Sequence, residues 1–157
     1  MTNEATIRGV GVSVGQEGLG APALILDVRD VVVPIFVDGG QAQAIERARQ
    51  GVPPERPMTH DLFAGVLEDA GITLAQVRID DLEDATFYAK LDLVADGPDR
   101  KEKIVRDARP SDAIALSVRI ACPILVADDV IDRAGLPPEE LGIEQADQRP
   151  WGADPVD

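Results

Sequence analysis

Apolar and polar residues alternate over two long segments of this chain, Leu74–Asp80 and Ala85–Val94, and this period of two constrains the fold more than any other feature. It places alternate side chains on opposite faces of a β-strand, so each segment predicts a strand with one buried and one wet face. The residues expected to face inward are Ala75, Val77, Ile79, Phe87, Ala89, Leu91 and Leu93. After turn residues at 96–99, Lys103–Asp107 is expected to return as an antiparallel partner.

The first part of the chain predicts a further strand and a tight hairpin. Thr6–Val14 alternates with β-branched residues and predicts a strand, whereas Gly15–Pro22, with three glycines and a proline, predicts a loop. The apolar runs Ala23–Val28 and Val31–Val37 are separated by two residues, a length that suits a tight hairpin. Pro34 indicates that the second run is an edge strand or contains a bulge, because proline cannot donate a backbone hydrogen bond.

Three helices are expected between and after these strands. They are Gln41–Gln50, His60–Ala70 and Asp112–Ile120, followed by a last strand at Pro123–Ala127 and a short helical turn at Val130–Ala134. Thr59 and Ser111 are the expected N-caps of the second and third helices. The third helix is apolar nearly all round and should be buried, while the second has an apolar stripe on one face. The stripe consists of Leu62, Phe63, Val66, Leu67 and Ala70.

Together these elements predict an α+β domain with a mostly antiparallel sheet, about three helices and two hairpin-plus-helix units. The two helix entries align at equal spacing, with Asp38–Ile45 matching Arg109–Leu116, so an internal duplication is a hypothesis. Residues 1–135 are expected to form the domain. Prolines and acids are frequent after that point, so residues 136–157 are expected to form an acidic, proline-rich flexible tail.

The charge of the chain is strongly negative, with 29 acidic residues against 15 basic ones and a formal net charge of -14. Such a surface can repel nucleic acid, because phosphate binding uses Lys and Arg. Alternatively, it keeps the protein hydrated in molar cytoplasmic salt, where the Debye length falls to about 3 Å. We favour this halophilic interpretation, under which the net charge does not exclude an anionic ligand.

Nothing in the sequence indicates a membrane, an export signal or redox chemistry. No apolar run reaches the length of a membrane helix, and Met1–Thr6 lacks the basic and apolar pattern of a signal peptide. We therefore expect a soluble, cytoplasmic protein. Cys122 is the only cysteine, which excludes an internal disulfide and a cluster of thiolate ligands.

The first group of reactive side chains, Arg56, His60 and Asp61, lies at the start of the second helix. A helix N-terminus offers unpaired amides and positive potential that attract phosphate, and an imidazole there can exchange protons. His60 is the only histidine, so a site with two histidines from one protomer is excluded. The structural alternative is that Thr59 caps the helix, Asp61 complements its dipole and Arg56 pairs with an acid.

The second group, Asp107, Arg109, Ser111 and Asp112, lies at the start of the third helix. Arg109 can present a planar fork to phosphate, and the two aspartates could supply oxygens to Mg²⁺ or Mn²⁺. The structural alternative is that Ser111 and Asp112 stabilise the first turn and that Arg109 pairs with Asp107 or another acid.

A third feature is a basic strip on the outer face of the strands. Arg78, Lys90 and Arg106 could lie beside Tyr88 and contact the backbone and bases of a nucleic acid. The alternative is an ordinary solvated sheet face.

These segments resemble the bifunctional nuclease domain family, also called domain of unknown function 151. The resemblance rests on Arg56–Leu62, Phe87–Ala89 and Asp107–Leu116, in this order and at similar spacing. With the hairpin before them and Cys122–Ile124 after them, it covers Thr6–Gly135. It implies an α+β fold, self-association and an activity on both DNA and RNA that is reported for some members.

The expected function is therefore hydrolysis of phosphodiester bonds in DNA, RNA or both, by His60 or a metal-bound water as base. The candidate catalytic residues are His60, Asp61, Asp107 and Asp112; the candidate phosphate ligands are Arg56, Arg109 and Ser111; and the candidate ligands of Mg²⁺ or Mn²⁺ are Asp107 and Asp112. Two alternatives stay open. One is a non-catalytic regulatory module that binds an anion or nucleotide, and the other is a protein whose role is to assemble into a homo-oligomer.

Overall fold

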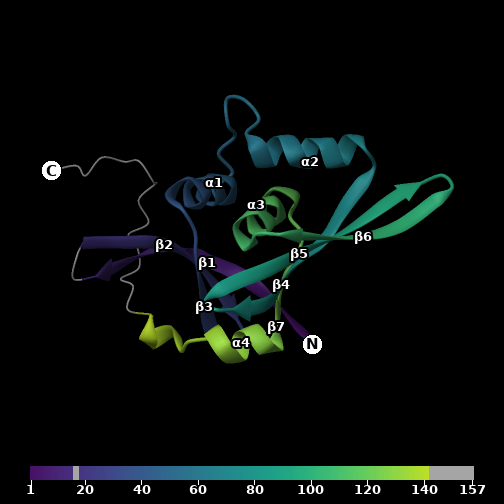
Figure 1. The fold of residues 1–157 in the computed structure, drawn as a ribbon. Helices are drawn as coiled ribbons and strands as arrows, with labels where there is room; N and C mark the ends of the chain where they lie inside the picture. The colour runs from purple at the N-terminus through teal and green to yellow at the C-terminus, as the bar shows by residue number, and fades with distance from the viewer. Residues whose placement is uncertain (16–17, 142–157) are drawn as a thin grey trace.

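The fold of the computed structural model, which describes residues 1–15 and 18–141, is α+β as expected (Figure 1). Seven strands form one sheet in the order β3-β2-β1-β7-β4-β5-β6. All neighbouring strands are antiparallel except β4 and β7. The strands are β1 (Thr2–Gly15), β2 (Gly18–Val28), β3 (Val31–Phe36), β4 (Ile72–Glu83), β5 (Thr86–Gly97), β6 (Arg100–Ala108) and β7 (Ile124–Ala127). The helices are α1 (Gly39–Arg49), α2 (Thr59–Asp69), α3 (Pro110–Ile120), α4 (Asp128–Ala134) and a short 3₁₀ helix, η1 (Pro138–Glu140).

Helices α1, α2 and α3 lie on one side of the sheet in Figure 1, and α4 lies on the other side against β3, β4 and β7. The central helix is α3, which contacts α1, α2, β4 and β5. Its buried residues are small or aliphatic, which allows the backbone to approach its neighbours closely. No helix among the described residues is long and apolar enough to span a membrane.

The period-two pattern of the sequence predicted the hairpins correctly. Val28 pairs with Val31 across the two-residue turn between β2 and β3, and β3, which contains Pro34, is an edge strand. Lys90 pairs with Asp107, so β5 and β6 form the expected antiparallel pair. The order β2-β3-α1 and β5-β6-α3 repeats as the sequence indicated, and whether the two units superpose stays a prediction.

Two strand expectations were wrong. Gly15–Pro22 is not a loop in its described part: Gly15 pairs with Gly18, so β1 and β2 continue almost to each other, because ladder hydrogen bonds need no side chains. Ala75 is exposed rather than buried, because a register shift between Leu74 and Gln76 turns Leu74 inward in its place.

Both expected N-caps were also wrong. The N-cap of α2 is Met58, and Thr59 is the first helical residue. The N-cap of α3 is Arg109, since Pro110 takes the first helical position, where its fixed φ and missing N–H are tolerated. Ser111 is therefore inside the first turn and buried.

The apolar stripe of α2 is covered only in part. Leu67 is buried, whereas Leu62, Phe63 and Val66 are exposed. Helix α2 contacts α3 and β4. Self-association, which would cover such a surface, stays a prediction.

The segment after residue 135 begins with ordered contacts. The Leu136 N–H donates to the Val32 carbonyl at 2.8 Å, and the Val32 N–H donates to the Leu136 carbonyl at 2.9 Å. Leu136 and Leu141 pack against three buried residues of β2 and β3. The expected flexibility of 142–157 lies outside the described residues, and the domain boundary stays a prediction.

Candidate functional site

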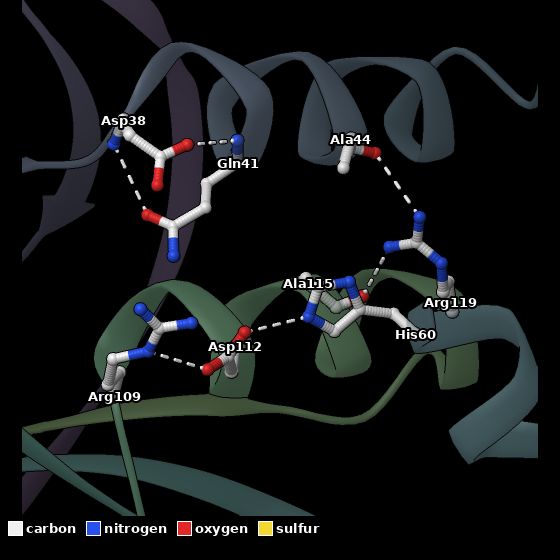
Figure 2. A network of polar contacts seen from close by, with 8 residues as sticks. All are labelled: Asp38, Gln41, Ala44, His60, Arg109, Asp112, Ala115 and Arg119. Carbon is white, nitrogen blue, oxygen red and sulfur yellow. Dashed lines mark hydrogen bonds and ion pairs between the residues drawn. The ribbon is translucent and has the colours of Figure 1, made fainter. Parts of the chain in front are cut away.

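The starts of α2 and α3, far apart in the sequence, meet through one hydrogen bond. His60 Nε2 lies 2.9 Å from Asp112 Oδ1, with His60 in the second position of α2 and Asp112 in the third position of α3 (Figure 2). The imidazole is 17% exposed. A ring held by a carboxylate and still open to solvent has the arrangement of a general base with an orienting acid.

The other oxygen of Asp112 accepts a hydrogen bond from Arg109. Arg109 Nε lies 2.9 Å from Oδ2, and the guanidinium is 70% exposed, so its terminal nitrogens face solvent. Burial acts to raise the pKa of Asp112, but the hydrogen bonds from Arg109 and His60 outweigh it, and the pKa is lowered. The carboxylate is therefore charged at neutral pH and can hold the imidazole.

Asp61 lies next to His60 in α2 but belongs to a different network. Its Oδ2 accepts from the Met58 N–H at 3.0 Å, and its Oδ1 accepts from Arg119 Nε at 2.8 Å. Burial acts to raise the pKa of Asp61, but the bonds from Arg119 and from the Met58 N–H outweigh it, and the pKa is lowered. Both oxygens are thus used to fix the start of α2 on α3.

Arg119 is the residue that the sequence reasoning missed. Its side chain is 11% exposed, and besides Asp61 it donates to the carbonyls of Ala115 in α3 and Ala44 in α1 (Figure 2). It therefore joins three helices. The signal was available, because Arg119 is the only basic residue in the apolar segment Asp112–Ile120.

The remaining candidates lie elsewhere. Asp107 is exposed and its Oδ1 pairs with Lys90 Nζ at 3.0 Å on the opposite strand, away from the partners of Asp112. Arg56 is exposed, and its guanidinium has no ion pair within residues 1–15 and 18–141. It is free to bind an anion from solvent.

The basic strip on the sheet is wrong in two respects. Arg106 pairs with Leu91 and so lies on the opposite face from Lys90, because directly paired residues share a face. Arg78 donates to both oxygens of Asp92, at 2.6 and 2.8 Å, and Lys90 pairs with Asp107. The two cations of the predicted strip that share this face, Arg78 and Lys90, are therefore paired with acids.

The comparison with known families decides what kind of domain carries this geometry. Residues 24–139 match the sequence model of the bifunctional nuclease domain family, and this range includes the starts of α2 and α3. The chain belongs to the bifunctional nuclease domain family.

Relatives from this family differ in how much of their length matches. An uncharacterized protein of Mycobacterium tuberculosis is 41% identical over 132 residues, which cover 83% of this chain and 76% of that protein. Bifunctional nuclease 2 of Oryza sativa subsp. japonica is 32% identical over 108 residues, or 67% of this chain and 33% of the rice protein. Bifunctional nuclease 1 of Oryza sativa subsp. indica is 28% identical over 110 residues and is likewise covered over 33% of its length.

The expected metal ligands of this bifunctional nuclease domain do not form a ready site. Both oxygens of Asp112 already accept hydrogen bonds, and Asp107 pairs with Lys90. In the part of the chain that the structure describes, no group of three or more His, Cys, Asp or Glu side chains is placed to hold a metal. Asp112 could ligate a cation through the lone pairs that these two hydrogen bonds leave unused, but it would be a single ligand.

A pocket of about 290 Å³ borders the site on the other side of Arg109. Its lining comes from the end of β3, the start of α1, the start of β5 and the start of α3. Ser111, the remaining candidate residue, lines this pocket rather than contacting His60. The bifunctional nuclease domain thus has the His60–Asp112 pair and a pocket on the two sides of Arg109.

Proposed function

We propose that this bifunctional nuclease domain hydrolyses phosphodiester bonds in DNA, RNA or both. The observation that supports it is the contact of 2.9 Å between His60 Nε2 and Asp112 Oδ1, with Arg109 on the second oxygen. Family membership suggests the reaction class, and this contact supplies a base and an acid that can orient it.

The role of His60 in the proposal follows from the hydrogen bond. Asp112 is ionised and can only accept, so Nε2 donates its proton to it and Nδ1 is left as the acceptor. Nδ1 takes a proton from water while the water oxygen attacks phosphorus. The bond from phosphorus to the leaving oxygen breaks, and the imidazolium returns the proton to that oxygen. Asp112 stabilises the imidazolium charge throughout.

The role of the arginines in the proposal is to hold the phosphate. Arg109 keeps its terminal nitrogens open to solvent while Nε stays on Asp112, so it can bind a phosphoryl oxygen beside His60. Arg56 precedes α2 by three residues and can add a second cation. Such contacts stabilise the charge that develops on the phosphate oxygens.

Asp107, Asp61 and the metal have lesser parts in the proposal. Asp61 positions the helix that carries His60, through Met58 and Arg119. Asp107 and Asp112 remain the proposed ligands of Mg²⁺ or Mn²⁺, and Asp112 would use the lone pairs that His60 and Arg109 leave free. A metal would supply charge stabilisation of the phosphate.

The second candidate function is a non-catalytic module that binds a small anion or nucleotide. The saturation of both site carboxylates favours it, because Asp61 and Asp112 each have an arginine and a further partner. Residues paired in this way can have a purely structural role, in which they hold the helices together.

The test is cleavage of labelled single-stranded DNA, duplex DNA and RNA by purified protein in molar KCl, with Mg²⁺, Mn²⁺ or a chelator. We expect cleavage by the wild type and loss in the His60→Ala, Asp112→Ala double variant. Thr59→Ala, one residue before His60, is the matched control and should cleave normally. Equal traces of cleavage by the wild type and the double variant would contradict hydrolysis and favour the binding module.

A further inference from the structure

The pocket beside Arg109 brings hydrogen-bond donors and aromatic surface together. Its lining residues are Ile35, Phe36, Gln41, Ala85, Thr86, Phe87, Arg109, Pro110 and Ser111. None of these nine residues is acidic, although the chain has 29 acids. Two of the three phenylalanines of the chain are among them. The pocket therefore combines a locally non-acidic lining with flat apolar surface.

One hydroxyl that lines this pocket has no protein partner. Ser111 is 7% exposed as a residue, and its Oγ makes no hydrogen bond with any side chain or carbonyl of the described residues. The hydroxyl oxygen is open to the pocket, so it can donate to a ligand in place of water. The N–H groups of Ser111 and Asp112 have no intrahelical acceptors, whereas Pro110 has no N–H and the Ala113 N–H donates to the Arg109 carbonyl. Arg109, the N-cap of α3, adds a cation at the rim.

Opposite α3, the start of α1 contributes Gln41. Its Oε1 accepts from the Asp38 N–H at 3.2 Å, which fixes the side chain and leaves Nε2 as a donor on the side that faces α3 (Figure 2). The polar groups of the pocket are thus donors from two helix starts, as an oxyanion requires.

The apolar part of the pocket fits a planar ring. Phe36 is 66% exposed at the end of β3, and Phe87 is half-buried at the start of β5. An aromatic side chain on an exposed strand end is a platform on which an unpaired base can stack. The volume of about 290 Å³ is at the lower limit of ligand pockets and suits one nucleotide rather than a duplex.

We propose that this pocket binds one nucleotide with an unpaired base. Its phosphate lies on Ser111 Oγ, the first amides of α3 and Arg109, and its base stacks on Phe36 and Phe87. This inference deepens the proposed function, because the bound nucleotide would lie beside the His60–Asp112 pair and belong to a single strand.

The test is titration calorimetry with 5′-AMP as the probe, beside adenosine and inorganic phosphate. We expect saturable binding of 5′-AMP, with each fragment binding at least about tenfold more weakly because it makes half of the contacts. Phe36→Ala should weaken 5′-AMP about tenfold through lost stacking, and Ser111→Ala about fivefold through a lost hydrogen bond. Val105→Ala, which removes an exposed apolar side chain of β6 outside the pocket, is the matched control and should bind normally.

Three results would overturn the nucleotide pocket. They are no binding of 5′-AMP by folded wild type, equal binding of 5′-AMP and phosphate, or unchanged affinity in both pocket variants. The fold of each variant is checked by its unfolding curve.

Hydrolysis is measured separately with His60→Ala, which lies outside the pocket lining. If 5′-AMP binds as described and no substrate is cleaved, the nucleotide-binding proposal is supported and the nuclease proposal is contradicted. If His60→Ala abolishes cleavage while both Phe36→Ala and Ser111→Ala leave 5′-AMP binding unchanged, the nuclease proposal is supported and the pocket is overturned.

Discussion

The starts of α2 and α3 carry the same residue type at the same position and use it differently. Asp61 and Asp112 are each the third residue of their helix, and each pairs with an arginine. Asp61 bonds back to the N–H of its own N-cap, as Gln41 does in α1. Asp112 makes no such bond and instead holds His60 of another helix.

The difference in exposure shows what each pair does. Arg119 is nearly buried and joins three helices, so the α2 pair contributes to stability. Arg109 is open to solvent, where an ion pair contributes little to stability. The α3 pair therefore holds an imidazole and an arginine for little gain in stability, which supports the proposal that the start of α3 forms the site.

The largest effect on stability is expected from Arg119→Ala. It leaves the partly buried Asp61 carboxylate without its cation and removes two further bonds that join the helices, so the free energy of unfolding should fall by about 3 kcal/mol. The carbonyls of Ala44 and Ala115 keep their donors within their own helices. Chemical denaturation measures it. Arg47→Ala is the control, because Arg47 is exposed on α1 beside the same helix junction. A fall of less than about 1 kcal/mol in Arg119→Ala would remove the distinction between the two pairs.

A smaller effect is expected in acid, from Asp61→Asn. The pKa of Asp61 is lowered from its ordinary 3.8 in the folded state, so its contribution to stability is present above that value and is lost as the pH falls below it. The variant should be less stable than wild type at pH 7 and should lose less stability as the pH falls below about 4. Unfolding curves measured across this range check it, and parallel curves for the two proteins would show that the Asp61 pKa is not lowered.

A still smaller effect on stability is expected from Arg109→Lys. The charge is kept and the exposed pair contributes little, so the free energy of unfolding should stay close to that of the wild type. Cleavage should nevertheless fall, because Lys cannot hold Asp112 and a phosphate with one planar fork. Wild-type cleavage in this variant would move the phosphate site away from Arg109.

The smallest effect is the dependence of these changes on salt. Molar KCl shortens the Debye length to about 3 Å and screens the exposed pair of Arg109 more than the nearly buried pair of Arg119. The stability change in Arg109→Lys should therefore vanish in KCl while that in Arg119→Ala persists. If KCl reduced the stability changes of both variants equally, the two ion pairs would be equally open to solvent.

The sequence predicted the elements better than their ends. Period-two patterns located β4 and β5, and two apolar runs separated by two residues located the hairpin from β2 to β3, because both patterns are local properties of the chain. The caps failed where two local preferences compete. Thr59 is a good cap, but Asp61 can reach back to Met58, and Pro110 takes the first position of α3 and so moves Ser111 inside.

The site was predicted only as two separate segments. His60 and Asp112 are 52 positions apart, and no local rule shows that two helix starts will meet. The burial of Arg119 and the pairing of Lys90 with Asp107 are also tertiary, although the register of β5 and β6 would have indicated the second. Halophilic adaptation of the acidic surface, with its net charge of -14, stays a prediction.

The most direct test compares Asp112→Asn with Asp61→Asn in one set of cleavage and unfolding measurements. Asp112→Asn should lower cleavage at least about a hundredfold, because Asn neither fixes the His60 tautomer nor stabilises the imidazolium, and should change the free energy of unfolding by about 1 kcal/mol or less. Asp61→Asn should lower the free energy of unfolding more than Asp112→Asn does. Its folded fraction should retain cleavage. Wild-type cleavage by Asp112→Asn would contradict the assignment of the α3 start as the active site.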